Sequence, residues 1–175
     1  MSLLLGASGH VYEFEAAGST FDKYRRNMSG LENVTPVHAA VGNTTGTLRF
    51  SGDGAGASIA ENGEEVPAVT LDGFCRTRNL PNVDFIKMDV EGAGHIALEG
   101  ATRIIKQQRP KMAFSAYHTA FDVISLPARI LNIASYTFKL RHFSNRACET
   151  VLFCIRSQWF CKNLYINFLL LLGCI

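Results

Sequence analysis

The stretch of sequence that most restricts the possible folds is residues 83–92, Val-Asp-Phe-Ile-Lys-Met-Asp-Val-Glu-Gly. Its apolar residues do not alternate strictly with polar ones, which is typical of a strand covered on both faces of a parallel sheet. The run ends on two carboxylates, Asp89 and Glu91. Ligands of open α/β sheets bind at the carboxyl ends of the strands, so this pair is a candidate for function. An Asp at a strand-to-helix junction is equally typical of a helix cap.

The composition indicates one globular domain. The chain has 175 residues, 47% of them hydrophobic and 18% charged, which is enough for an ordinary core. A net charge of +2 without a dense Lys/Arg block excludes nucleic acid as an expected partner. Five cysteines, an odd number without Cys-x-x-Cys spacing, favour reduced thiols and a cytoplasmic location. Residues 164–175 are apolar but fall short of the ~20 residues that cross a bilayer, so no membrane anchor is expected.

Strand and helix patterns alternate along the chain, which predicts a doubly wound α/β sheet. The expected strands are residues 10–15, 34–41, 48–50, 66–71, 83–90 and 112–117, and the expected helices are 20–28, 96–107 and 121–134. A final pair of strands, 136–143 and 150–155, predicts an antiparallel edge. Residues 1–7 resemble the last turns of a helix, residues 52–60 a loop, and residues 164–175 a strand, a helix or a tail foreign to the domain.

Five residues at predicted strand ends are expected to converge on one cleft: Glu15, Val41, Asp89, Glu91 and His118. An acid at such a strand end accepts hydrogen bonds from ribose hydroxyls in nucleotide-binding folds, although a surface glutamate is the alternative. A histidine there is a candidate general base, with a hydrogen-bonded structural histidine as the alternative. No His-x-x-x-His or comparable ligand spacing supports a metal site, and the absence of a glycine-rich phosphate loop argues against kinase or dehydrogenase chemistry.

These motifs together resemble the FkbM-type family of S-adenosylmethionine-dependent methyltransferases. The resemblance covers residues 9–153 and is most specific in Asp-Phe-Ile-Lys-Met-Asp-Val-Glu-Gly-Ala at 84–93. The other segments that carry it are Val-Tyr-Glu-Phe-Glu at 11–15, Ala-Val-Gly at 40–42, Gly-Thr-Leu-Arg-Phe at 46–50, Thr-Leu-Asp at 70–72, Leu-Glu-Gly-Ala at 98–101, Arg-Pro-Lys at 109–111 and Tyr-His at 117–118.

The resemblance implies a Rossmann-like methyltransferase fold and methyl transfer from S-adenosylmethionine to an acceptor, with a hydroxyl of a small molecule or sugar as the expected target. Its implied cofactor-binding residues are Glu15 for the ribose hydroxyls, Ala40 and Val41 for the adenine, Ser58 on a loop that closes over it, and Asp89 near the transferred methyl group. His118 or Asp89 is the candidate base. In an in-line displacement the protein chiefly positions the acceptor and can remove its proton.

The family pattern begins with a strand and a glycine-rich turn, neither of which is visible before Ser2. We therefore expect a methyltransferase domain over residues 1–155, partial at its N-terminus, followed by an apolar tail of unknown role over 156–175. The strand that is not visible is the central one, between the strands that end at Glu15 and Asp89. Its neighbours would then have two unpaired apolar edges.

Two alternatives to an active methyltransferase follow from the same residues. The first is a catalytically inactive methyltransferase-like fragment or binding module, because Gly94 stands where the family usually has a glutamate. The second is a nucleotide-sugar or dinucleotide-binding domain, which would share Glu15 and the α/β pattern without explaining Asp-Val-Glu-Gly at 89–92. Binding of S-adenosylhomocysteine or NAD separates these readings.

Overall fold

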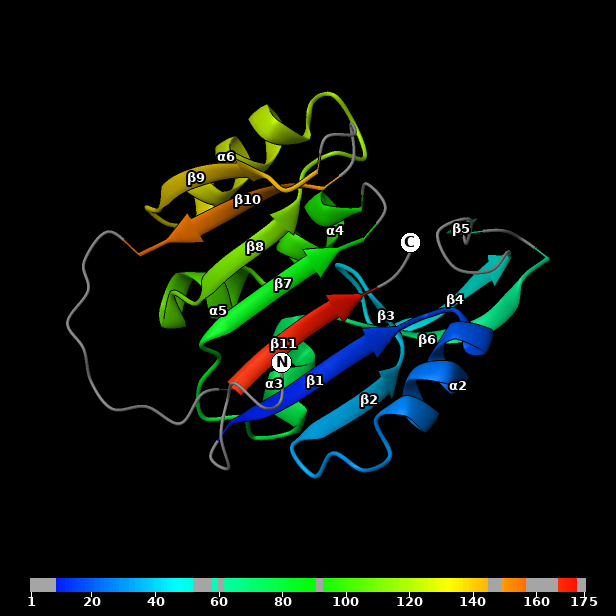
Figure 1. Ribbon diagram of the computed structural model, residues 1–175. Helices are drawn as coiled ribbons and strands as arrows, with labels where there is room; N and C mark the ends of the chain where they lie inside the picture. Colours follow the sequence, from blue (N-terminus) through cyan, green and yellow to red (C-terminus); the bar gives the residue numbers. More distant parts are fainter. Residues whose placement is uncertain are drawn as a thin grey trace.

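The computed structural model describes residues 9–51, 58–59, 62–90, 93–144, 149–156 and 167–172, which form two sheets and their covering helices (Figure 1). The larger sheet has seven strands in the order β2-β1-β11-β7-β8-β10-β9. Its members are β1 (His10–Glu15), β2 (Val34–His38), β7 (Phe85–Asp89), β8 (Lys111–Ser115), β9 (Thr137–His142), β10 (Thr150–Ile155) and β11 (Asn167–Leu172). The expected helical turns at residues 1–7 lie outside the described residues.

A smaller four-stranded sheet has the order β3-β6-β4-β5. It consists of β3 (Ala40–Val41), β4 (Gly46–Ser51), β5 (Ser58–Ile59) and β6 (Glu64–Val69). The helices are α2 (Gly18–Asn27), α3 (Leu71–Thr77), α4 (Gly94–Glu99), α5 (Thr102–Gln108) and α6 (Asp122–Ile133). The single strand expected at 34–41 is therefore divided between the two sheets, at the point where the Ala39 amide donates to the carbonyl oxygen of Glu15. None of the described helices is long and apolar enough to span a bilayer.

Five neighbouring strands of the larger sheet, β2, β1, β11, β7 and β8, are parallel. Strand β10 pairs with both β8 and β9 in antiparallel register. This confirms the expected α/β fold with a mostly parallel sheet and antiparallel C-terminal strands. The carboxyl ends of β1, β11, β7 and β8 meet along one edge of the sheet (Figure 1), which places the residues after these strands close to one another.

The centre of the sheet differs from the sequence expectation. Strand β11 lies between β1 and β7, with His10 opposite Asn167 on one side and Asp89 opposite Leu172 on the other. The expectation that the edges of β1 and β7 would be unpaired is therefore wrong. Residues 167–172 form a strand, and both neighbouring edges gain main-chain partners through it, which removes the unpaired edges that promote aggregation.

The main core lies between the larger sheet and its helices. Tyr12 and Phe14 on β1 both meet the ring of Phe74 on α3 edge to face, at centroid distances of 5.2 and 4.8 Å. Helix α3 was not expected from the sequence, which predicted a strand over residues 66–71, whereas β6 ends at Val69 and α3 begins at Leu71. The helix forms because the Thr70 hydroxyl accepts a hydrogen bond from the Gly73 amide and caps its first turn.

The single helix expected at 96–107 is divided into α4 and α5 at Gly100. A methyl group on Gly100 would clash with the carbonyl oxygen of Gly42, so the helix axis breaks where these two backbones touch. Helix α5 then starts with its first amides bound to the Asp72 carboxylate, which accepts from the amides of Arg103 at 2.8 Å and Ile104 at 2.9 Å. The Thr-Leu-Asp motif at 70–72 and the Leu-Glu-Gly-Ala motif at 98–101 therefore contact each other where α4 ends and α5 begins. We call this contact the joint between α4 and α5.

Candidate active site

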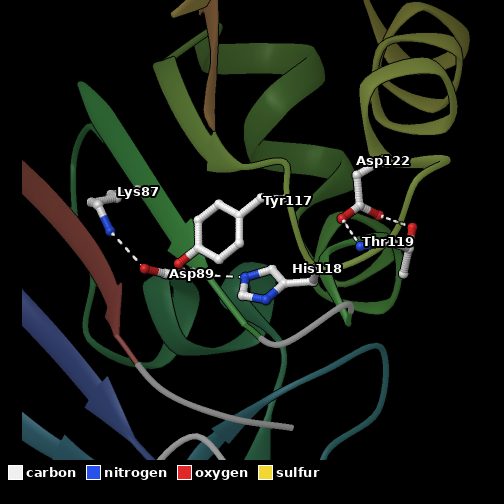
Figure 2. A network of polar contacts seen from close by, with 6 residues as sticks. All are labelled: Lys87, Asp89, Tyr117, His118, Thr119 and Asp122. Atoms are coloured by element: carbon white, nitrogen blue, oxygen red, sulfur yellow. Dashed lines mark hydrogen bonds and ion pairs between the residues drawn. The ribbon is translucent and has the colours of Figure 1, made fainter. Parts of the chain in front are cut away.

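The side chains of Asp89 and His118 meet at the tips of β7 and β8 (Figure 2). Asp89 is the last residue of β7, and His118 follows β8, the parallel neighbour of β7. The Asp89 Oδ1 atom lies 3.0 Å from His118 Nε2. A carboxylate oxygen can only accept, so Nε2 carries the proton and donates it. This contact fixes the tautomer of the imidazole and leaves Nδ1 as its basic atom.

Lys87 and Tyr117 also contact the Asp89 carboxylate (Figure 2). The Lys87 ammonium is 3.5 Å from Oδ2, and the Tyr117 hydroxyl donates to Oδ1 at 3.4 Å. Burial by itself would raise the pKa of Asp89, but hydrogen bonds from His118 and Ser115 and the positive charge of Lys87 outweigh it. The pKa of Asp89 is thereby lowered to about 2, so this side chain is an anion at neutral pH.

The segment after β8 holds His118 in place. The Asp122 carboxylate accepts from the Thr119 amide at 2.9 Å and from the Thr119 hydroxyl at 2.7 Å, which closes a tight turn before α6 (Figure 2). The ring of Tyr117 lies 4.3 Å from that of His118. Only 10% of the His118 side chain is exposed, against 28% for Asp89, so the pair is positioned from several sides yet open to solvent through the carboxylate.

A hollow beside His118 is lined by apolar residues and a few polar ones. Its walls are Met88, Val90, Gly94, Phe114, Ser115, His118, Asp122 and Leu126. At Gly94, a Cβ atom would lie 3.3 Å from the Leu126 Cδ2 atom, so a larger side chain at this position requires a small shift of Leu126. A glutamate at this position would therefore compete for the space beside the pair.

Glu15 lies at the carboxyl end of β1, on the same sheet edge as Asp89 (Figure 1). This residue is 2% exposed, and its Oε1 atom accepts from the Ala17 amide at 2.8 Å. Burial raises the pKa of Glu15, while backbone hydrogen bonds from Ala17 and Ala16 and the nearby His38 act in the opposite direction. The carboxyl group is therefore fixed in orientation, but the surrounding chain closes over it.

The other predicted cofactor residues lie around the smaller sheet. Ala40 and Val41 form β3, and both are buried, Val41 within the main core. Ser58 belongs to β5, but its side chain is outside the described residues, as is the whole of Glu91. The structure thus brings Asp89 and His118 into contact and places Glu15 on the same edge, while the side chain of Ser58 and the whole of Glu91 lie outside the described residues.

Sequence reasoning assigned no role in the site to three residues of this network: Lys87, Tyr117 and Asp122. Lys87 could have been found from its spacing, because residues two apart on a strand share a face and Lys87 precedes Asp89 by two. Asp122 follows Thr119 by three residues, a spacing typical of a capped helix start. Within the described part of the chain, no group of three or more His, Cys, Asp or Glu residues is arranged to hold a metal ion.

Comparisons with known proteins agree with this architecture. A family model described as the methyltransferase FkbM domain matches residues 1–140. The crystal structure of a methyltransferase FkbM from Methylobacillus flagellatus KT is similar, with a TM-score of 0.64 and 25% sequence identity. The alignment covers 83% of this chain but only 36% of that one, so this chain spans about a third of the other protein's length. No curated protein matches the chain.

Proposed function

Since the chain belongs to the FkbM methyltransferase family, we propose that it transfers a methyl group from S-adenosylmethionine to a hydroxyl group of a small molecule or sugar. The observation that carries this proposal is the hydrogen-bonded pair of Asp89 and His118 at the carboxyl edge of β7 and β8. A hydroxyl is a weak nucleophile, and a positioned base that takes its proton strengthens it during the transfer.

The two members of the pair have different roles in this proposal. Asp89, with a pKa of about 2, is too weakly basic to take a proton from a hydroxyl at neutral pH. Imidazole is the ordinary base near neutral pH, so His118 accepts the proton at Nδ1. Asp89 orients the ring through Nε2 and stabilises the imidazolium that forms. The donor, when bound, would give its methyl group to the acceptor oxygen and leave as S-adenosylhomocysteine, and His118 would hold the hydroxyl proton.

The described residues fit the chemistry of the methyl donor. Its ribose hydroxyls and its ammonium group are hydrogen-bond donors, and the carboxylates of Glu15 and Asp89 at one sheet edge are acceptors of suitable strength. We assign Glu15 to the ribose and Asp89 to the methionine end. S-adenosylmethionine supplies the activated methyl group, and the protein supplies orientation and a base. Because Glu15 is only 2% exposed, binding requires a shift of the chain that covers it.

That same burial favours one alternative, a methyltransferase-like module that does not catalyse. If the segment that covers Glu15 does not move, the ribose of the methyl donor cannot reach the Glu15 carboxylate. The methyl donor then does not bind beside the Asp89–His118 pair. The same fold and the same hollow are compatible with an enzyme and with a module that does not catalyse. Binding of the cofactor product distinguishes them.

The test is a thermal unfolding curve of the full chain with and without S-adenosylhomocysteine, followed by incubation with methyl-labelled S-adenosylmethionine and a panel of sugars and small alcohols. A ligand that binds only the folded state raises the midpoint. We expect such a shift, its loss in Glu15→Gln, and its retention in the matched control Glu32→Gln, which changes an exposed glutamate. An unchanged midpoint in the wild-type chain would contradict the proposal and favour the module. A shift without label in any acceptor would contradict only the choice of acceptor.

A further inference from the structure

Strand β11 connects the two parts of the larger sheet through main-chain pairing with β1 on one side and β7 on the other. Residues 167–171 pair with His10–Phe14 of β1, and residues 168–172 pair with Phe85–Asp89 of β7. Each neighbour has one further partner, β2 for β1 and β8 for β7. Without β11 the other six strands of this sheet would therefore separate into two sheets, β2-β1 and β7-β8-β10-β9.

The covalent path to β11 also differs from that of the other parallel strands. Strands β1 and β2 are joined through α2, and β7 and β8 through α4 and α5, as is usual for adjacent parallel strands. Strand β11 follows β10, which is three positions away in the strand order. In the pairing with β1, residue 10 lies opposite residue 167, so this contact closes nearly the whole chain into a loop. Contacts between residues so far apart in the sequence are the slowest to form during folding.

The connecting segment is long relative to the distance it must cover. Ile155 and Asn167 both lie at the amino edge of the parallel strands, because β10 runs antiparallel to β8. Three strand spacings amount to about 14 Å. Residues 156–166 reach up to about 36 Å when extended. The covalent connection therefore permits the position of β11 but does not dictate it, and the pairing with β1 and β7 selects it.

We propose that the space between β1 and β7 is a binding site for an extended apolar segment in parallel orientation, and that residues 167–172 of this chain occupy it as a ligand held by main-chain hydrogen bonds. This is strand addition between two facing edges, where the backbone gives affinity and the alternate side chains give selectivity. The sequence of the occupant, Asn-Phe-Leu-Leu-Leu-Leu, has the apolar character of a strand buried on both faces.

Occupation of this site also completes the edge that carries the candidate active site. Leu171 is in register with Phe14, next to Glu15, and Leu172 is in register with Asp89. The two carboxylates thus stand at the tips of the strands on either side of β11. Binding of the C-terminal segment therefore sets the spacing between them, which couples the segment to the site without any contact with a substrate.

The test cleaves the connection in the folded full chain. A recognition sequence for a specific protease is inserted between residues 156 and 167, and the native protein is cut and passed over a sizing column. We expect both fragments to elute together with an unchanged near-ultraviolet circular dichroism spectrum. Release of the small fragment, whether the large one stays folded or aggregates, would overturn the proposal, because a bound strand must remain after its tether is cut.

A labelled peptide of residues 160–175 makes the test independent of how variants of the whole chain fold. Added in excess to the cut protein, it should replace the small fragment. A peptide with Leu170→Pro lacks one amide hydrogen in a strand paired on both sides, and we expect its binding to be weaker by at least about tenfold. A peptide with Lys162→Pro, outside β11, is the matched control and should bind like the unmodified peptide. Equal binding of all three peptides would refute a main-chain binding mode.

Discussion

At the scale of single residues, the contact between Asp89 and His118 makes a kinetic prediction. His118→Ala should lower kcat by roughly 100-fold or more, the range typical of a general base. Asp89→Asn should lower kcat and also move the acidic limb of the rate profile to lower pH, because removing the carboxylate destabilises the imidazolium form. Asp89 itself adds no limb near neutral pH, since its pKa is about 2. Rates from pH 5 to 9 test this.

The control for this experiment is His142→Ala, which changes an exposed histidine on β9 that bonds only to Thr150 among the contacts described for its ring. Its rate profile should match that of the wild-type chain. If Asp89→Asn shifted the acidic limb upward, or if His118→Ala and His142→Ala had equal rates, the assignment of the base would be wrong.

A second residue-scale prediction concerns Glu13 on β1. This residue is 1% exposed, and neither of its carboxyl oxygens has a hydrogen-bond partner in the described part of the chain. Burial, and then the charge of Glu15, raises its pKa from 4.5 to about 7. A carboxyl group with a raised folded-state pKa contributes its stability fully below pH 4.5 and loses it as the pH rises through 7. The loss is about 3 kcal/mol.

Glu13→Gln keeps the shape and removes the charge, so it should be more stable than the wild-type chain by an amount that grows from pH 5 to pH 8. Urea unfolding at several pH values measures this difference directly. Glu32→Gln, at an exposed position, should show no such trend. A difference between Glu13→Gln and the wild-type chain that stayed constant with pH would show that Glu13 keeps an ordinary pKa in the folded state.

At the scale of elements, the joint between α4 and α5 makes the clearest prediction. Gly100→Ala would place a methyl group against the carbonyl oxygen of Gly42, and the φ of −72° at Gly100 shows that the conflict is one of space and not of backbone conformation. Because the clashing atom belongs to the backbone and cannot move aside as a side chain can, the cost lies at or above the upper end of ordinary overpacking, about 3 kcal/mol. We expect a midpoint lower by at least about 6 °C in thermal unfolding. Gly30→Ala, with open space around the added methyl group, is the control and should change little.

The sequence predicts elements well where one local pattern governs them. Strand β1 was expected with the observed bounds, and β7 and β8 within a few residues, because their apolar runs are long and end on turn or polar residues. Helix α3 was missed because its start depends on the capping hydroxyl of Thr70, which lies within the strand expected over residues 66–71. The break at Gly100 depends on a backbone 58 residues earlier in the chain, at Gly42, which no local pattern reports.

In the candidate site too, features set by a local sequence pattern were predicted, and features set by packing between distant segments were not. Asp89 and His118 were expected together because strand ends of a parallel sheet meet at one edge, and the structure has them 3.0 Å apart. The closure around Glu15 was not foreseen, because burial depends on which segments pack over a residue. The place of β11 was unforeseeable for a related reason. Strand β11 has six residues, five of them apolar, and this short run far from β1 in the chain gives no indication of which two strands it will join.

At the scale of the whole molecule, the central strand holds the two halves of the fold together. The half with β1, β2 and α2 carries Glu15, and the half with β7, β8 and α6 carries Asp89 and His118. The core extends across both halves, since Phe14 and Ile86 belong to the same buried cluster. Loss of β11 would therefore remove the main-chain pairing between the halves and expose apolar surface at the same time.

This arrangement predicts what a chain that ends at Arg156 will do. It retains every described helix but has two unpaired edges, those of β1 and β7, which are templates for pairing with other chains. We expect no cooperative thermal transition and the growth of large particles in light scattering at micromolar concentration. A control chain that replaces residues 157–166 by a Gly/Ser segment of equal length keeps β11 and should unfold cooperatively as a monomer. A truncated chain that stays monomeric with the midpoint of the full chain would show that the two halves of the sheet pair without β11.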